Sequence, residues 1–179
     1  AEMHTTIYSI AESPKNPMVI WAGTDDGNLQ LTRDGGKTWT NVVTNVPGLP
    51  AFSWVSWVEA SRFDAATAYA CFDRHTFGDM APHVFKTTDY GKTWKRLVSA
   101  TSGVRGYAHC VKEDTVNPSL LFLGTEFGLW ISLDEGKTWA AFKARDFPAV
   151  AVREIQVHPR EGDLVLAADL IGIGTDELD

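Results

Sequence analysis

Three aspartates recur in the same local setting along this chain. Asp34, Asp89 and Asp134 each begin an Asp-x-Gly-Lys-Thr-Trp hexapeptide, and the copies are 55 and 45 residues apart. A carboxylate can act as a general acid, a general base or a nucleophile, and a pair of carboxylates can hydrolyse a glycosidic bond. However, three equivalent copies cannot share one active site, and hydrogen bonds from a carboxylate's own turn lower its pKa. We therefore expect these aspartates to hold the architecture together.

Each residue type in the hexapeptide has a place in a tight turn between two strands. The glycines would supply positive φ, the aspartates would accept backbone N–H bonds across the turn, and the threonines would add a hydroxyl bond. The tryptophans would pack between neighbouring sheets, each burying roughly 150–250 Å². The residues assigned to these structural boxes are Thr32, Asp34, Gly36, Thr38, Trp39, Thr87, Asp89, Gly91, Thr93, Trp94, Ser132, Asp134, Gly136, Thr138 and Trp139.

A second set of residues could form a ligand-binding face. Asp25 and Glu126 follow apolar runs in the segments "GTDDG" and "GTEFG", where they could face a cleft, although loops are often acidic for solubility alone. Trp54 and Trp57 are three apart in "SWVSW", so on a regular strand one would enter the core and the other would face out. The full candidate face is Trp54, Trp57, Tyr107, His109, Arg105, Arg153, Asp25 and Glu126. Core packing of the aromatic residues and solvated strand-end arginines remain the alternatives.

We predict no metal and no cofactor. The segment from residue 73 to 83 is expected to be a long loop and carries Asp73, His75, Asp79 and His83, which are ligand types for a metal. An interaction loop is the favoured interpretation. The two cysteines lie in the apolar runs "AYACF" and "YAHCV", without the spacing of a zinc site, and are expected to be buried thiols.

Composition narrows the classes of partner. The chain has 179 residues, seven of them Trp, and a net charge of −7. Without a cluster of Lys and Arg, an acidic chain is a poor match for nucleic acid or for an anionic membrane surface. No apolar run reaches the roughly 18 residues of a membrane span.

The elements that must position these residues repeat along the chain. An alternating run, an Asn-Pro turn and a second apolar run follow one another at residues 6–32 and again at 106–132, before the box is complete. Four units are expected, at about residues 4–46, 52–99, 104–144 and 149–179, and the last contains no box. This period is typical of β-propeller blades, which are four-stranded antiparallel sheets. We predict an all-β fold of about three and a half blades, a partial propeller forming a single domain over residues 1–179.

The pattern Ser/Thr-x-Asp-x-Gly-x-Thr-Trp resembles the Asp-box, or BNR repeat. "VIWAGTDDGNLQLTRDGGKTW" and "FKTTDYGKTW" carry the resemblance, which is greatest to bacterial sortilin-like and glycosyl-hydrolase BNR-repeat proteins. The resemblance implies a propeller and suggests a secreted or periplasmic location. A sialidase of this type would need an Arg-Ile-Pro motif, which is absent here.

These observations favour a non-catalytic binding or scaffolding module for a protein, peptide or glycan. The alternative is a glycoside hydrolase, sialidase-like or xyloglucanase-like, or an inactive fragment of one. A partial propeller also leaves open sheet edges, and two copies of the chain could cover each other's edges and complete a ring.

Overall fold

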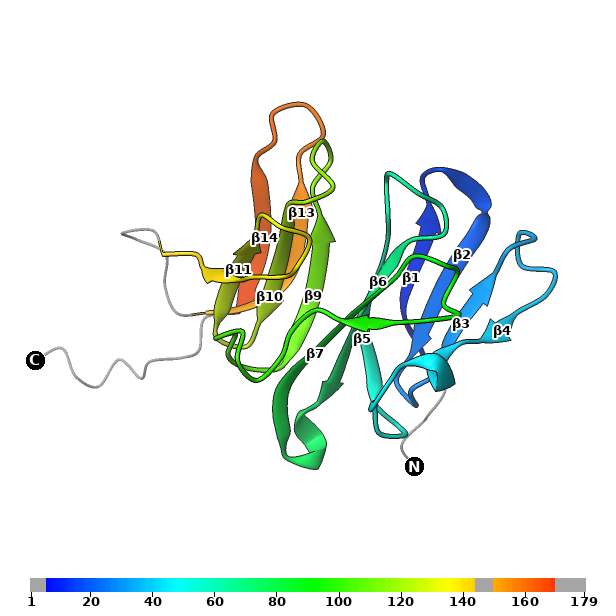
Figure 1. Ribbon diagram of the computed structural model, residues 1–179, viewed down its shortest axis with the longest axis horizontal. Coiled ribbons are helices and arrows are strands. Elements are labelled where there is room, and N and C mark those ends of the chain that lie inside the picture. Colours follow the sequence, from blue (N-terminus) through cyan, green and yellow to red (C-terminus); the bar gives the residue numbers. More distant parts are fainter. Residues whose placement is uncertain (1–5, 144–149, 170–179) are drawn as a thin grey trace, which may run out of the picture.

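The computed structural model describes residues 6–143 and 150–169, and it confirms the all-β fold. Three four-stranded antiparallel sheets and one two-stranded sheet follow one another along the chain and lie side by side, from blue to orange in Figure 1. The predicted first, third and fourth units extend beyond the described residues at 4–5, 144, 149 and 170–179. In the described part, no helix is long and apolar enough to cross a membrane.

Each sheet is a meander whose strands pair in chain order. The first contains β1 (Ile7–Ser13), β2 (Asn16–Thr24), β3 (Leu29–Thr32) and β4 (Thr40–Asn41). The second contains β5 (Trp54–Ala60), β6 (Ala68–Arg74), β7 (Asp79–Thr87) and β8 (Lys95–Arg96). The third contains β9 (Ala108–Glu113), β10 (Leu121–Thr125), β11 (Gly128–Ser132) and β12 (Ala140–Ala141), and the fourth contains β13 (Ala151–Val157) and β14 (Leu164–Asp169). Two short 3-10 helices, η1 (Val43–Asn45) and η2 (His75–Phe77), complete the described elements.

The first strand of each sheet lies on the inside of the arc. β1 contacts β5, β5 contacts β9, and β9 contacts β13. The residues between successive sheets form three apolar clusters, so the core is divided among the sheet-to-sheet interfaces. This radial arrangement is that of propeller blades around an axis, and it brings the starts of the four inner strands together.

The box residues make their contacts within the turn. Asp34 accepts a 2.9 Å hydrogen bond from the Thr38 amide and a 2.6 Å bond from the Thr38 hydroxyl. The Thr32 hydroxyl donates to Asp34 at 2.8 Å and accepts from the Gly36 amide at 2.9 Å. Gly36 has a φ of +90°, a conformation that glycine adopts without strain. The second and third boxes repeat these contacts with their equivalent residues.

The three box tryptophans differ in burial. Trp94 is 7% exposed and packs edge-on against Trp21 of the first sheet, with ring centroids 6.0 Å apart. The Trp139 indole N–H donates to the carbonyl of Leu97 in the second sheet at 3.2 Å. Trp39 does not follow the expectation of packing between sheets, because its side chain is 43% exposed. Each box packs on the sheet that precedes it, and no sheet precedes the first in the described residues.

The inner strand of the first sheet, β1, is exposed on the same side as Trp39, where no described sheet covers it. Val55 and Val58 of β5 are buried against Gly23, whose absent side chain leaves them room. Ile7 and Ile10 occupy the equivalent positions of β1, as the strand registers show, and are 61% and 65% exposed. We call the surface formed by Ile7, Ile10 and Trp39 the leading face.

The segment from residue 73 to 83 is more regular than a long loop. β6 continues to Arg74, η2 makes the turn, and β7 begins at Asp79, so residues 79–83 are strand. The prediction of a long loop was therefore wrong, because main-chain pairing of β6 with β7 outweighs the polar composition of this segment. Cys71 and Cys110 are buried and free, with no disulfide.

Candidate functional site at the axis

The four inner strands share an irregularity near their starts. The pairing of each inner strand with its neighbour skips one residue, which is the mark of a β-bulge. A bulge changes the direction of the side chain that it carries, because the extra residue has no pairing partner. The skipped residues are Tyr8, Ser56, His109 and Arg153, one from each sheet.

The second strand of each sheet brings a carboxylate to the same end. By strand register, the equivalent positions hold Asp25, Asp73, Glu126 and Asp169. The Asp25 carboxylate accepts from the Thr6 amide at 2.9 Å. The amide of Glu126 bonds to the carbonyl of Tyr107 at 3.2 Å, which continues the pairing of β10 with β9. Four bulge residues and four acidic residues therefore surround the starts of the inner strands.

The bulge residues line one cavity of about 380 Å³, which we call the axis cavity. Its size is within the range of small-ligand sites. Its lining residues are Tyr8, Trp54, Ser56, Trp57, Asp73, His75, His109, Arg153, Glu154 and Ala167.

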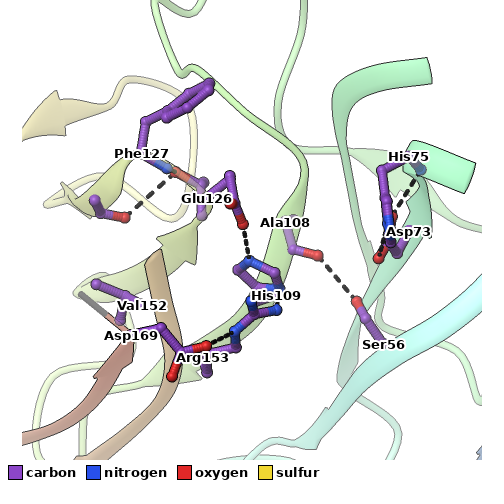
Figure 2. A network of polar contacts seen from close by, with 12 residues as sticks. Ser56, Asp73, His75, Ala108, His109, Glu126, Phe127, Val152, Arg153 and Asp169 are labelled. Carbon is purple, nitrogen blue, oxygen red and sulfur yellow. Dashed lines mark hydrogen bonds and ion pairs between the residues drawn. The ribbon is translucent and has the colours of Figure 1, made fainter. Parts of the chain in front are cut away.

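A polar network joins the third and fourth sheets on one side of the axis cavity (Figure 2). His109 Nε2 lies 2.9 Å from Glu126 Oε2, and the Arg153 guanidinium lies 3.5 Å from His109 Nδ1. Arg153 also donates from Nε to Asp169 at 2.6 Å. A guanidinium only donates, so His109 Nδ1 accepts and His109 Nε2 carries the proton that is donated to Glu126. This arrangement describes a neutral imidazole between an arginine and a carboxylate.

A second histidine–carboxylate pair comes from the second sheet. His75 Nδ1 lies 2.8 Å from both oxygens of Asp73. The His75 ring stacks on Tyr107, with centroids 4.6 Å apart, and the edge of Tyr107 meets His109 at 4.8 Å. Tyr107 therefore connects the two pairs. Asp73 and His75 lie at the end of β6 and in η2, whereas His109 lies on β9 and Glu126 in the β10–β11 hairpin (Figure 2).

Burial and hydrogen bonding determine the charge of this network. Burial lowers the pKa of His109, although the hydrogen bond to Glu126 opposes this effect. Burial would raise the pKa of Glu126, but hydrogen bonds from His109 and Tyr107 outweigh it and lower the value. Burial, followed by the bond to Glu126, raises the pKa of Tyr107 to about 12. At neutral pH the network therefore contains an ionised Glu126 and a neutral His109.

Aromatic side chains also line the axis cavity. Trp54 and Trp57 both line it, whereas a regular strand would place residues three apart on opposite faces. The expectation of opposite faces was wrong because the bulge at Ser56 inserts one residue and restores a common side. Tyr8 meets the Trp54 ring edge-on, with centroids 4.7 Å apart.

Most of the predicted ligand face lies together, but not all of it. Trp54, Trp57, His109 and Arg153 line the axis cavity, and Tyr107 and Glu126 contact its histidines. Asp25 lies at the same end of the first sheet. Arg105 does not belong to this group, since it lines a separate cavity with Trp130.

Sequence reasoning missed Tyr8, Ser56 and Asp169. The bulges that direct Tyr8 and Ser56 have no visible sequence signal. Asp169 could have been found by aligning "LVLAAD" with "LFLGTE" and "VIWAGTD", since all three end on an acidic residue at the same register.

The histidines and aspartates of the η2 hairpin separate into two pairs. Asp73 binds His75, while Asp79 binds His83 at 2.8 Å and Arg96 approaches the other nitrogen of His83. Among the described residues there is no group of three or more His, Cys, Asp or Glu that could hold a metal ion.

Four-stranded sheets that each carry an Asp-box turn are arranged around an axial cavity, which defines the chain as an Asp-box β-propeller. The profile of the Sortilin-Vps10 family, described as "Sortilin, neurotensin receptor 3", matches residues 82–175, more than half of the chain. The chain therefore belongs to this family.

Two curated relatives match parts of the chain. The oligoxyloglucan-reducing end-specific xyloglucanase of Emericella nidulans is 31% identical over 133 residues, which are 67% of this chain and 15% of that protein. The vacuolar protein sorting/targeting protein 10 of Aspergillus oryzae is 24% identical over 84 residues, which are 46% of this chain and 6% of that protein. The chain thus spans a small part of either relative.

Solved structures agree on the fold. An ancestral GH74 enzyme superposes with a TM-score of 0.71 at 18% identity, over 94% of this chain and 22% of that one. YCF48 bound to D1 peptide superposes with a TM-score of 0.62 at 20% identity, over 90% of this chain and 48% of that one. At these identities the likeness extends to the propeller fold alone.

Proposed function

We propose that this chain is a non-catalytic binding module and that its axis cavity holds a neutral glycan. The observation that carries the proposal is that Trp54 and Trp57 line the same cavity as the Arg153 guanidinium and the Asp73 carboxylate. Aromatic rings pack against the apolar C–H face of a sugar, while charged groups bond its hydroxyls. The named activity of the Emericella relative supports a carbohydrate ligand.

Charge favours a glycan over an acidic peptide. Among its described lining residues, the axis cavity holds the carboxylates of Asp73 and Glu154 and one permanent cation, Arg153. An acidic ligand would meet like charge there. A neutral or cationic peptide is the other ligand that this lining accepts, so peptide binding is an outcome of the test below.

The hydrogen bonds of the carboxylates favour binding over catalysis. A glycosidase of the common type needs one carboxylic acid that stays protonated at the working pH. Glu126 has a lowered pKa, and Asp73 is committed to both the ring and the amide of His75. The environment of Glu126 therefore does not favour the protonated acid that such a mechanism requires.

Glycoside hydrolysis is the second candidate. It is favoured by the carboxylates that gather at one end of the sheets and by the xyloglucanase relative. Release of reducing ends from xyloglucan or cello-oligosaccharides, with loss of turnover in Asp73→Asn or Glu126→Gln, would establish this function in place of the non-catalytic one.

Calorimetric titration with neutral oligosaccharides tests the binding proposal. Trp54→Ala should weaken binding about fivefold to thirtyfold, since aromatic stacking contributes about 1–2 kcal/mol. Trp39→Ala is the matched control, because that tryptophan is exposed on the leading face and lies outside the axis cavity. Equal affinity of the two variants, or binding of a basic peptide alone, would contradict the glycan proposal.

We also propose that the leading face binds another propeller blade, with a second copy of this chain as the source to test first. At the positions of Ile7 and Ile10, the second sheet buries Val55 and Val58 against the preceding sheet. Light scattering on the eluting protein should give about twice 19.7 kDa, and Ile10→Lys should return the mass to that of one chain. A single-chain mass at all concentrations would refute the second copy as the partner.

A further inference from the structure

A second cavity, of about 630 Å³, is lined by residues of the third sheet and of the segment that precedes it. We call it the outer cavity. It is formed by the segment between β8 and β9, the β10–β11 hairpin and the ends of β11 and β12. Its lining residues are Gly103, Arg105, Phe127, Trp130, Ala141 and Lys143.

The aromatic walls of the outer cavity are held in place. Trp130 of β11 pairs with Ala141 of β12, and its indole N–H donates to the Thr125 hydroxyl at 3.1 Å. Phe127 packs against Gly106, where a β-carbon would come within 2.9 Å of the phenyl ring. Phe127 nevertheless stays 52% exposed, so part of its surface remains available to a ligand. The two rings form a preorganised apolar surface.

The described charged residues of the outer cavity are of one sign. Arg105 and Lys143 are its charged lining residues, and both are exposed. No hydrogen bond or ion pair among the described residues occupies either side chain. Among the residues that the structure describes, none with an acidic, amide or hydroxyl side chain lines the outer cavity. Positive charge beside aromatic walls is unusual in a chain with a net charge of −7.

We propose that the outer cavity binds a small organic carboxylate with an apolar body. The Trp130 and Phe127 rings hold the body, while the Arg105 fork and the Lys143 ammonium hold the carboxylate. A sugar fits poorly because its hydroxyls would find few hydrogen-bonding side chains in this lining. A bare inorganic anion would leave the aromatic surface uncovered. This inference is independent of the glycan proposal, because the two cavities share no lining residue.

The test is an NMR titration of the ¹⁵N-labelled chain with 3-phenylpropionate. The expected result is a saturable shift of the Trp130 indole N–H and of the Gly103 and Arg105 amides. Two matched probes separate the contributions: 3-phenylpropionamide keeps the body without the charge, and acetate keeps the charge without the body. Each should bind at least about tenfold more weakly, as expected for the loss of a charge-assisted hydrogen bond or of a buried ring.

Variants complete the test. Arg105→Gln combined with Lys143→Gln should weaken 3-phenylpropionate binding at least about tenfold, and both positions are exposed, so the fold should persist. Lys15→Gln, an exposed lysine of the first sheet, is the matched control and should change nothing. The proposal is overturned if the amide binds as tightly as the carboxylate, if acetate does, if the double variant binds like the parent, or if no shift occurs.

Discussion

Replacing the box tryptophans one at a time should reveal how the blades stabilise one another. Trp94 and Trp39 hold the same position in successive boxes, but Trp94 is 7% exposed and Trp39 is 43% exposed. Trp94 packs on Trp21 of the preceding sheet, whereas the Trp39 indole N–H bonds within its own turn, to Gly36 at 3.2 Å. Truncation to alanine should therefore have unequal costs.

The expected difference follows from burial. The two exposed fractions, applied to about 200 Å² of side-chain surface at about 25 cal/mol/Å², differ by about 2 kcal/mol of transfer free energy. Trp94→Ala also leaves a cavity and should lose about 3–5 kcal/mol of unfolding free energy. Trp39→Ala should lose about 2 kcal/mol less than Trp94→Ala. Urea unfolding followed by circular dichroism measures both values.

A milder variant covers the case in which Trp94→Ala does not fold. Trp94→Phe keeps an aromatic ring against Trp21 and loses no indole hydrogen bond, since Trp94 Nε1 has no partner in the structure. It should therefore retain most of the stability. Equal losses for Trp39→Ala and Trp94→Ala would refute the reasoning, because the box tryptophan would then act through its own turn.

Three further predictions concern titration and reactivity. The Thr38 hydroxyl and amide hold the pKa of Asp34 at about 2, so a carboxyl NMR titration of Thr38→Val should give a higher pKa for Asp34. The stability that ionised Asp34 contributes is fully present above the ordinary pKa of aspartate and is lost as the pH falls through the pKa of Asp34 in the folded protein. Burial lowers the pKa of His109, although the hydrogen bond to Glu126 opposes this effect. The stability of the fold should therefore decrease as the pH drops through the ordinary pKa of histidine. Glu126→Gln should lower the pKa of His109 further, and a higher His109 pKa in this variant, measured by imidazole NMR, would contradict this account. Burial raises the pKa of the Cys110 thiol to about 12, so a disulfide reagent at pH 8 should label it only after urea unfolds the chain, and rapid native labelling would oppose that account.

Local features of this protein could be predicted from the sequence. The Asp34 carboxylate bonds the residue four positions later, and the glycine that makes the turn lies between them, so the hexapeptide contains every group that its turn requires. Three copies in phase then predict three boxed sheets, because each copy marks the same turn of a repeated unit.

The axis cavity could not be predicted from the sequence, because it is formed by contacts between residues that are far apart along the chain. Arg153 reaches His109 across 44 positions, and His75 stacks on Tyr107 from another sheet. Composition and spacing do not encode these approaches, since they follow from how the sheets pack around the axis. The outlying position of Arg105 and the two separate histidine–aspartate pairs likewise required the tertiary structure.

The box tryptophans illustrate which features could be predicted from the sequence and which depend on how the sheets pack. The equivalent turns of Trp39 and Trp94 could be predicted because they depend on neighbours along the chain. The burial of Trp94 and the exposure of Trp39 could not be predicted, because they depend on whether another sheet covers the residue. In the same way, the bulge at Ser56 placed Trp54 and Trp57 on one side, since a single unpaired residue reverses the alternation that the sequence predicts.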